Sequence, residues 1–271
     1  MFLETTTSEF YSEGFFGYGE KGDFQYFSFW HFLPIIILIA SIILTYIFRE
    51  RIKSFKYEKQ VRLGLSILMF IFEIGYYWRL LYCGNPDRTN LLCNLPFQVC
   101  TWSAIFTIFM LISETRWMFD YCVFVCLTLG LIPLATPAVI VTTGPTYFRY
   151  YQFFFEHMIP IYSVFYLMFI RGFKFNIKRV WIPFLILFIG SMISIALNSN
   201  IEGANYFYLG TSTSGDSLAN IMPENMWVRL PIYGAITIFA FGIEALIFWL
   251  FNKNKRKESN EDNGKEIEET Q

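Results

Sequence analysis

Long apolar runs, separated by short segments rich in charged residues, proline or glycine, dominate the chain. A helix needs about 20 mostly apolar residues, at about 1.5 Å of rise each, to cross the hydrocarbon core of a bilayer. Runs of this kind are Phe29 to Phe48, Val61 to Tyr82, Leu95 to Ser113, Met118 to Val141, Tyr150 to Ile170, Val180 to Leu197 and Met226 to Phe251. Pro133 and Pro137 interrupt the fourth run, and we expect a bend there. The pattern predicts an all-α, polytopic transmembrane bundle of about seven helices.

The composition agrees with a bilayer setting. Of the 271 residues, 55% are hydrophobic, 21% are aromatic and only 16% are charged, which is too apolar for an ordinary soluble domain. The sequence has no glycine-rich phosphate-binding loop, and nothing in it favours nucleic-acid binding. We expect membrane lipids to be the partners of the chain, and we expect no cofactor.

The positive charges are segregated along the chain. Of the 21 Lys and Arg residues, 16 fall in the first, third and fifth loops and in the C-terminal segment, which share one side of the membrane if seven helices alternate. Short cytoplasmic loops retain Lys and Arg. The N-terminus is therefore predicted outside and the C-terminus in the cytoplasm, with the chain in the plasma (cytoplasmic) membrane.

Three parts follow from this pattern. Residues 1–28 form an acidic, aromatic-rich extracellular segment, which either lies on the outer membrane surface or is a disordered tail, and which lacks the basic start of a signal peptide. Residues 29–251 form the transmembrane domain. Residues 252–271 alternate Lys, Glu and Asn with almost no apolar residue, and they are predicted to be a disordered cytoplasmic tail.

Ionisable residues inside the predicted helices are few. Each costs about 2.5 to 3.5 kcal/mol to insert at mid-bilayer, so each is a candidate functional residue. The candidates are Glu73, Arg79, Glu156, His157 and Glu244. Helix rise places Glu73 about 14 Å below the outer surface, where it can meet His157. Arg79 lies about 5 Å below that surface, where its side chain is expected to snorkel to the interface.

Cys100 and His157 fall at the same predicted depth, about 8 to 10 Å below the outer surface. A catalytic thiol needs a base or a positive neighbour, and His157 is the only imidazole predicted to be buried, because His31 is expected at the membrane interface. The alternative is that Cys100, with Ser103 and Thr107 on the same helical face, is a small residue where two helices pack closely.

The other cysteines suggest less chemistry. Cys83 and Cys93 flank a short outer loop, and two thiols in an oxidising compartment can pair or stay free. Cys122 and Cys126 share one helical face, but no carboxylate or imidazole accompanies them. No metal site is expected.

Several motifs, taken in order, resemble those of the YwaF-like bacterial integral membrane proteins. They are Leu95-Pro96-Phe97-Gln98-Val99-Cys100, Phe153-Phe154-Phe155-Glu156-His157 and Asn205-Tyr206-Phe207-Tyr208-Leu209, followed by Ser217-Leu218 and Trp227, with Glu73 and Trp78 upstream. The resemblance covers about residues 29 to 251. This bacterial family is similar to the eukaryotic transmembrane protein 164, which is regarded as an acyltransferase acting on ether phospholipids.

The resemblance implies that the catalytic Cys and His of that family fall on Cys100 and His157. It also implies that a fatty acyl group passes through the Cys as a thioester. Two departures stand out. Gln98 occupies a position where the family usually has His, and residues 221–227 replace a Gly-Pro-Trp-Pro-Trp-like stretch.

Three function hypotheses follow. The first is a membrane-embedded lipid acyltransferase or thioesterase, with Cys100 as nucleophile, His157 as general base and Glu73 as a group that orients the imidazole. Its substrate-binding residues would be Gln98, Arg79, Asn198, Asn205 and Tyr206, with Gln98 or Asn205 donating to the oxyanion. The second is a transporter or lipid-binding protein with a Glu/His/Arg-lined cavity. The third is a structural protein whose polar residues hold the bundle together.

Overall fold

The computed structural model describes residues 14–17, 24–83, 91–137, 144–210 and 222–269, except for the side chains of 81–83, 91 and 251–269. Its α-helices are α2 (Phe29–Ile47), α3 (Arg49–Lys53), α4 (Glu58–Cys83), α5 (Val99–Ser113), α6 (Arg116–Thr128), α7 (Leu131–Ala135), α8 (Phe148–Ile170), α9 (Trp181–Asn200) and α10 (Met226–Glu269). Short 3₁₀ turns are η1 (Leu91–Asn94), η3 (Ile177–Arg179) and η4 (Tyr206–Tyr208). The described part of the chain is helical and has no strand, which confirms the all-α prediction.

Six helical segments in the described residues are long and apolar enough to cross a membrane. They correspond to six of the seven predicted runs, and α6 and α7 together form one of them. The remaining run is α5, an apolar helix of 15 residues, which at about 1.5 Å per residue is shorter than a typical bilayer core. The bend in the fourth run comes before its prolines. Gly130 N–H bonds to Val125 O (3.0 Å), five residues back, and Pro133 then lacks an N–H to continue the helix.

Ion pairs at one end of the bundle show how the helices alternate. Glu58, at the start of α4, binds Arg62 (Oε1–Nε 2.8 Å), and Arg62 binds Glu114, which directly follows α5 (Nη2–Oε1 2.7 Å). Glu114 also binds Arg171, which directly follows α8 (Oε2–Nε 2.8 Å). The start of α4 therefore lies beside the ends of α5 and α8. We call this the basic end, defined by Arg62, Arg116, Arg171 and Arg179.

Further contacts bring the other helices to the basic end. Asp120 in α6 binds both Arg116, at the start of α6, and Arg179, just before α9. Phe248 of α10 stacks on Phe175, which lies between α8 and α9 (ring centroids 4.2 Å apart). Helices α6 and α9 therefore start at the basic end, and α10 passes it. Successive long helices run in alternating directions, as a multi-pass membrane protein requires.

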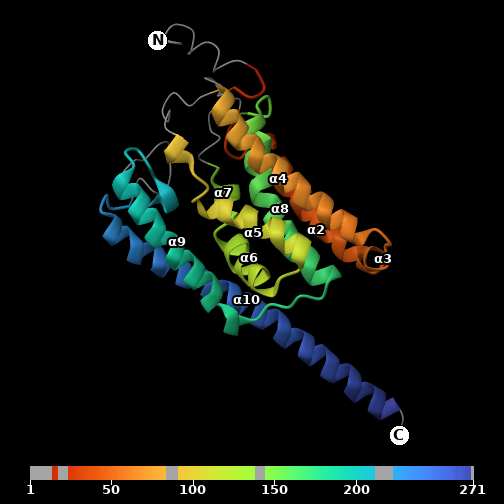
Figure 1. Cartoon of the computed structure of the whole chain (residues 1–271). Helices are drawn as coiled ribbons and strands as arrows, with labels where there is room; N and C mark the ends of the chain where they lie inside the picture. The colour runs from red at the N-terminus through yellow and green to blue at the C-terminus, as the bar shows by residue number, and fades with distance from the viewer. Residues whose placement is uncertain (1–13, 18–23, 84–90, 138–143, 211–221, 270–271) are drawn as a thin grey trace, which may run out of the picture.

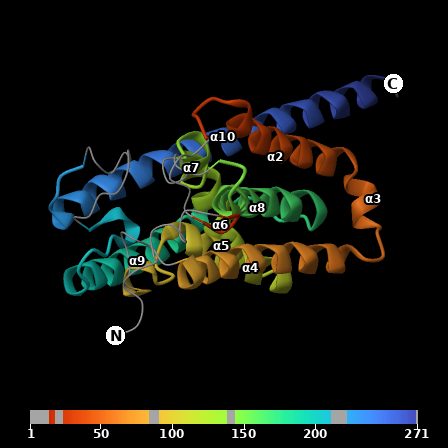
Figure 2. The same ribbon diagram turned by 90° about the horizontal axis from the view of Figure 1, so that it is seen from above.

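Helix α8 is the centre of the bundle. It contacts α2, α4, α5 and α6, and most of its residues are buried. Figure 2 shows α8 between α2 and α4. Many of its buried side chains are aromatic, including Phe153 and Phe154 (ring centroids 5.5 Å apart). A helix that is apolar on nearly all sides is suited to this position, because it meets protein rather than lipid in most directions.

Helix α5 begins at Val99, four residues later than the run Leu95 to Ser113 suggests. Pro96 lies in the segment before it, and Gln98 has an extended backbone (φ −96°, ψ 152°) at the N-cap position. Proline in that segment disfavours a helical conformation for the residue before it. As a consequence, Cys100 is the second residue of α5 instead of lying more than a turn inside it.

Helix α10 continues to Glu269, so residues 252–269 are helical rather than disordered. Figure 1 shows this part of α10 projecting away from the bundle. Lys and Glu, which are frequent in this segment, are good helix formers. Low hydrophobicity, on which the prediction of disorder rested, does not exclude a helix that extends from a membrane span.

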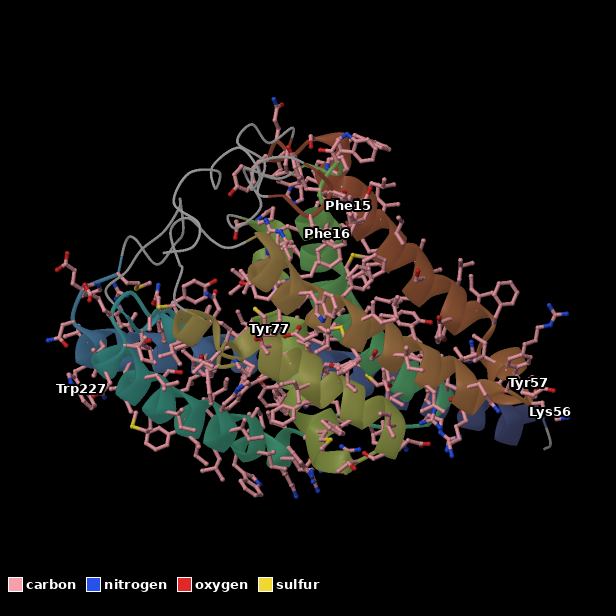
Figure 3. The ribbon with its side chains drawn as sticks, turned by 45° about the horizontal axis from the view of Figure 1, so that its top comes forward. Phe15, Phe16, Lys56, Tyr57, Tyr77 and Trp227 are labelled. Carbon is pink, nitrogen blue, oxygen red and sulfur yellow. The ribbon has the colours of Figure 1, made fainter. Side chains whose placement is uncertain are left out.

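The described N-terminal residues pack onto the bundle at the end opposite to the basic end. Phe15 and Phe16 contact the ring of Phe148 at the start of α8 (centroids 6.0 and 5.1 Å apart; Figure 3). Arg79 of α4 donates to Phe16 O (3.0 Å) and Gly17 O (3.1 Å) and is only 3% exposed. The prediction that Arg79 snorkels to the interface is wrong, because this segment supplies carbonyl acceptors that bury it.

His31 is also buried rather than interfacial, with 2% exposure. Phe27 N–H donates to its Nδ1 (3.0 Å), so Nε2 carries the proton and donates to Leu134 O (2.8 Å) in α7. The imidazole thus joins the start of α2 to α7. Its role is in the packing of the two helices.

Candidate functional site

Cys100 and His157 are in contact. The Nε2 atom of His157 on α8 lies 3.2 Å from the Sγ atom of Cys100 on α5. The equal depth predicted for the two residues is confirmed by this distance. His157 is 6% exposed, and Cys100 is partly buried, so the pair lies inside the bundle.

The imidazole is held in one tautomer. Its Nδ1 atom lies 2.7 Å from the carbonyl oxygen of Phe153, one turn earlier on α8. A carbonyl only accepts, so Nδ1 must carry the proton and donate it. The lone pair of Nε2 then faces the thiol and accepts the S–H proton, which is the arrangement a general base requires.

The position of Cys100 at the start of α5 brings backbone donors to the same place. The first N–H groups of a helix have no partner inside the helix. The N–H groups of Cys100 and Thr101 have no backbone acceptor in the described part of the chain. They offer the donors that an oxyanion formed next to Sγ would need.

Two buried carboxyl groups accompany the pair. Glu73 on α4 is 7% exposed, and its Oε2 atom has no hydrogen-bond partner among the described residues. Glu156 on α8 is 8% exposed and accepts from Gln152 Nε2 (2.8 Å). Both carboxyl groups act electrostatically on the thiol of Cys100. Two carboxyl groups this close to a thiol and an imidazole make the site rich in proton-binding groups.

The group that orients the imidazole is the Phe153 carbonyl, whereas the sequence suggested Glu73. The carboxylate that acts on the ring electrostatically is Glu156. Glu73 instead lies near Thr101, Arg149 and Glu156. Glu73 is therefore part of the polar cluster with Arg149 and Glu156, and it does not orient the imidazole of His157.

Arg149, in the first turn of α8, is the cation of this cluster. Its Nη1 atom donates to Gln152 Oε1 and lies 3.8 Å from Glu156 Oε2. Its guanidinium lies over the ring of Tyr76 (4.9 Å to the centroid). Sequence reasoning did not single out Arg149, which directly precedes the predicted run Tyr150 to Ile170. The signal that could have found it is its spacing from Gln152 and Glu156, which places the three side chains on one face of a helix.

The predicted substrate-binding residues Gln98, Asn198, Asn205 and Tyr206 come together in one place. Gln98 donates from Nε2 to Asn205 O (3.0 Å) and accepts at Oε1 from Phe207 N–H (3.0 Å). Asn198 pairs with both backbone groups of Tyr206, at 2.8 and 3.0 Å. The hydroxyl of Tyr206 accepts from Leu95 N–H (2.8 Å) and donates to Leu92 O. These residues join the segment 205–210 to the start of α5.

That segment has an unusual backbone. Phe207 and Tyr208 both have φ of 54°, a left-handed conformation that costs non-glycine residues about 1 to 3 kcal/mol each. Gln98 holds Phe207, and Arg229 of α10 donates to Tyr208 O (3.1 Å). Strained backbone of this kind is common around functional sites.

Among the described residues, no other thiol lies within hydrogen-bond distance of the pair. Cys93 is free and its Sγ donates to Glu202 O (3.3 Å), while the side chain of Cys83 lies outside the described residues. Cys122 and Cys126 are buried in α6. Within the described ranges, no three His, Cys, Asp or Glu side chains are grouped as a metal site would need.

Comparison with known proteins identifies the chain. Neither the curated proteins nor the solved structures gave a significant match. The model of the TMEM164 family matches residues 26–258, which is most of the sequence and includes both Cys100 and His157. The chain therefore belongs to the TMEM164 family, a family of multi-pass membrane proteins.

Proposed function

We propose that this protein is a membrane-embedded lipid acyltransferase that uses Cys100 as nucleophile and His157 as general base. The observation that carries the proposal is the 3.2 Å contact between Sγ and an imidazole nitrogen whose other nitrogen is bound to a carbonyl. A thiol acts as a nucleophile when a correctly oriented base removes its proton. A buried pair with this geometry in a lipid-facing bundle favours an acyl group as the substrate.

The first half-reaction forms an acyl-enzyme. Nε2 of His157 takes the S–H proton, and the Cys100 sulfur attacks the carbonyl carbon of a lipid ester. The tetrahedral intermediate collapses, the C–O bond breaks, and the leaving alkoxide takes the proton from Nε2. The products are a lysolipid and a thioester on Cys100.

The second half-reaction reverses these roles. The hydroxyl of an acceptor lysolipid gives its proton to Nε2 and attacks the thioester carbon. The C–S bond breaks, and the sulfur recovers the proton from Nε2. With water as the acceptor, the same steps hydrolyse the lipid ester to a fatty acid and a lysolipid. With a thioester as the donor in the first half-reaction and water as the acceptor, they give a thioesterase.

The start of α5 supplies the oxyanion donors in this proposal. The N–H groups of Cys100 and Thr101 take that role. Gln98, the residue before α5, donates to Asn205 O, and this hydrogen bond helps to fix the position of the start of α5. Gln98 offers one donor and one acceptor to the segment 205–210, which a neutral imidazole also does. The His of the resembling bacterial proteins is therefore expected to serve the same supporting purpose, and its replacement by Gln98 leaves the base, His157, in place.

We also propose that the site faces the outside of a bacterial plasma membrane. The basic end carries most of the loop Lys and Arg residues, which cytoplasmic loops retain. Cys100 lies at the opposite end of α5. The acyl chains would then come from the outer leaflet.

The test is acyl transfer between phospholipids by the purified full-length protein in lipid nanodiscs, with a radiolabelled donor acyl chain. We expect Cys100→Ala to abolish transfer, and Cys122→Ala, a buried thiol on α6 that contacts Thr107, to leave it unchanged. A labelled thioester on Cys100 should be released by hydroxylamine. Full transfer by Cys100→Ala would overturn the proposal.

The Oε2 atom of Glu73, which has no partner within the described ranges, favours one second candidate, a transporter or lipid-binding protein without covalent chemistry. A buried carboxyl group with a free oxygen can bind a cation or relay a proton. In that case Cys100→Ala would be nearly silent, whereas Glu73→Gln would abolish binding or transport. The two variants therefore separate the two candidates.

A further inference from the structure

Three arginines lie buried or nearly buried at the end of the bundle that holds Cys100, and they differ in their partners. Arg79 donates to two carbonyls of the N-terminal segment. Arg229 donates to the carbonyls of Pro223, Tyr208 and Gly210 and is 1% exposed. Both use their N–H groups to hold the backbone. They act as structural clamps.

Arg149 differs from those two. The contacts of its guanidinium with Gln152 and Glu156 involve Nη1 alone. Among the described residues, no acceptor lies within hydrogen-bond distance of its Nε or Nη2. The side chain keeps 13% of its surface exposed, so a ligand can reach part of it. Nε and Nη2 carry N–H groups along one edge of the guanidinium. They form the flat, two-pronged donor that binds two oxygens of one anion.

Building on the proposed function, we propose that Arg149 binds the phosphate of the phospholipid donor and so places its acyl ester at Cys100. Arg149 is the cation that acts electrostatically on the Cys100 thiol. It stands in the first turn of α8, eight positions before His157, which is about 12 Å along the axis. Its side chain bridges part of that distance, since it reaches Gln152 and Glu156 on the following turns.

The level of these groups fits a phospholipid. The phosphate lies at the membrane surface, and the acyl esters lie just below it, a glycerol unit away. Arg149 lies correspondingly nearer the end of α8, and the Cys100–His157 pair lies deeper along it. Rings of Tyr76 and Phe153 cover the guanidinium (4.9 and 5.9 Å to the centroids), which limits its movement.

The charges around Arg149 predict the direction in which phosphate affinity should change when they are altered. Glu73 and Glu156 face the same region and repel an incoming phosphate whenever they are ionised. Arg149 must overcome that repulsion. Replacement of Glu156 by Gln keeps the shape, removes one negative charge, and should therefore strengthen phosphate binding.

The experiment compares two donors with identical labelled acyl chains, phosphatidylcholine and diacylglycerol, of which only the first has a phosphate. Acyl loading of Cys100 is measured for the full-length wild type, Arg149→Gln and Arg149→Lys. We expect Arg149→Gln to lower kcat/KM for phosphatidylcholine about 10- to 100-fold, the loss of charge-assisted hydrogen bonds. Diacylglycerol loading should change less than threefold, as a rough bound on indirect effects. Arg149→Lys should be intermediate, and Glu156→Gln should lower KM for phosphatidylcholine.

Equal loss with both donors, or no loss with either, would overturn the proposal. Arg49→Gln, an exposed arginine at the basic end, is the control for general charge loss. If Arg149→Gln does not fold, the KM change of Glu156→Gln decides alone, and an unchanged or higher KM overturns the proposal.

A binding measurement separates this proposal from the proposed function. Cys100→Ala protein, which forms no acyl-enzyme, is titrated with fluorescent short-chain phosphatidylcholine and diacylglycerol. Tighter binding of phosphatidylcholine that depends on Arg149 supports the phosphate site even if no acyl transfer is found. Equal binding of both lipids, or a preference for phosphatidylcholine that persists in Arg149→Gln, would contradict a phosphate site at Arg149.

Discussion

Glu58 and Glu73 lie on the same helix, α4, and each is 7% exposed, yet their surroundings are opposite. Glu58, at the basic end, accepts from Arg62 (2.8 Å) and from the Tyr166 hydroxyl (3.3 Å). Glu73, near Cys100, has one oxygen without any partner in the described part of the protein. Burying a carboxylate is costly unless it is paired and hydrogen-bonded. Within α4, the comparison indicates that Glu58 serves stability and that Glu73 is available for chemistry.

The same contrast holds for the groups around them. At the basic end, Arg62 binds Glu58, Glu114 and Leu111 O, and Asp120 binds two arginines. At the Cys100 end, only Nη1 of Arg149 contacts protein acceptors, and its Nε and Nη2 atoms have none among the described residues. Proteins keep unsatisfied polar groups mainly where a ligand or a proton will satisfy them. Substitutions near Cys100 should therefore lower acyl-transfer activity, whereas substitutions at the basic end should lower the free energy of unfolding.

The largest expected effect is on activity, at the Cys100 end. His157→Gln removes the general base and should lower acyl transfer about 10³-fold, within the usual contribution of such a base. The free energy of unfolding should change by less than about 1 kcal/mol, because the amide can still bond to Phe153 O. Transfer assays and thermal unfolding in the same detergent check both values. Loss of folding without a separable loss of activity would support a structural role for the pair.

At the basic end the effect should be on stability. Arg62→Met leaves Glu58 buried without its partner and should lower the free energy of unfolding by about 3 to 5 kcal/mol. Activity per folded molecule should remain near that of the wild type, since Arg62 lies far along α4 from Glu73. Arg49→Gln, whose side chain is exposed, is the control and should change stability by less than about 0.5 kcal/mol.

The two carboxyl groups of α4 can be tested as a matched pair. Glu58→Gln should cost about 1 to 3 kcal/mol because it weakens a charged hydrogen bond to Arg62. Glu73→Gln should cost less than about 1 kcal/mol, since Oε2 loses no bond. Denaturant titration of both variants measures the difference. Equal losses would show that Glu73 also contributes mainly to stability.

The smallest expected effect concerns the contact between α4 and α8. A Cβ at Gly75 would lie 2.6 Å from Cζ of Phe148, so Gly75→Ala must shift that ring and should cost about 1 to 2 kcal/mol. Gly64→Ala on the same helix is the control, because nothing lies within 4 Å of its Cβ. It should stabilise α4 by about 0.5 to 1 kcal/mol. Thermal unfolding distinguishes the signs, and a loss in both variants would contradict the close approach at Gly75.

Much of the architecture is determined by local sequence. Apolar runs of membrane-spanning length, bounded by charges, predict six long helices and the shorter α5, with the largest difference at the C-terminal end of α10. Helix rise alone placed Cys100 and His157 at one depth, because position along a helix is a matter of counting residues. Both conclusions depend on regularities that a single segment carries by itself.

The tertiary structure decided which polar groups meet. His31, Arg79 and Gln98 bind backbone groups that are far away in the sequence. No local sequence pattern predicts these hydrogen bonds. For the same reason Arg149 became part of the site, and Phe153 O, rather than Glu73, orients His157. Hydropathy tells which residues enter the bilayer. The direction of each buried side chain depends on how the helices pack, and packing is a property of the whole bundle.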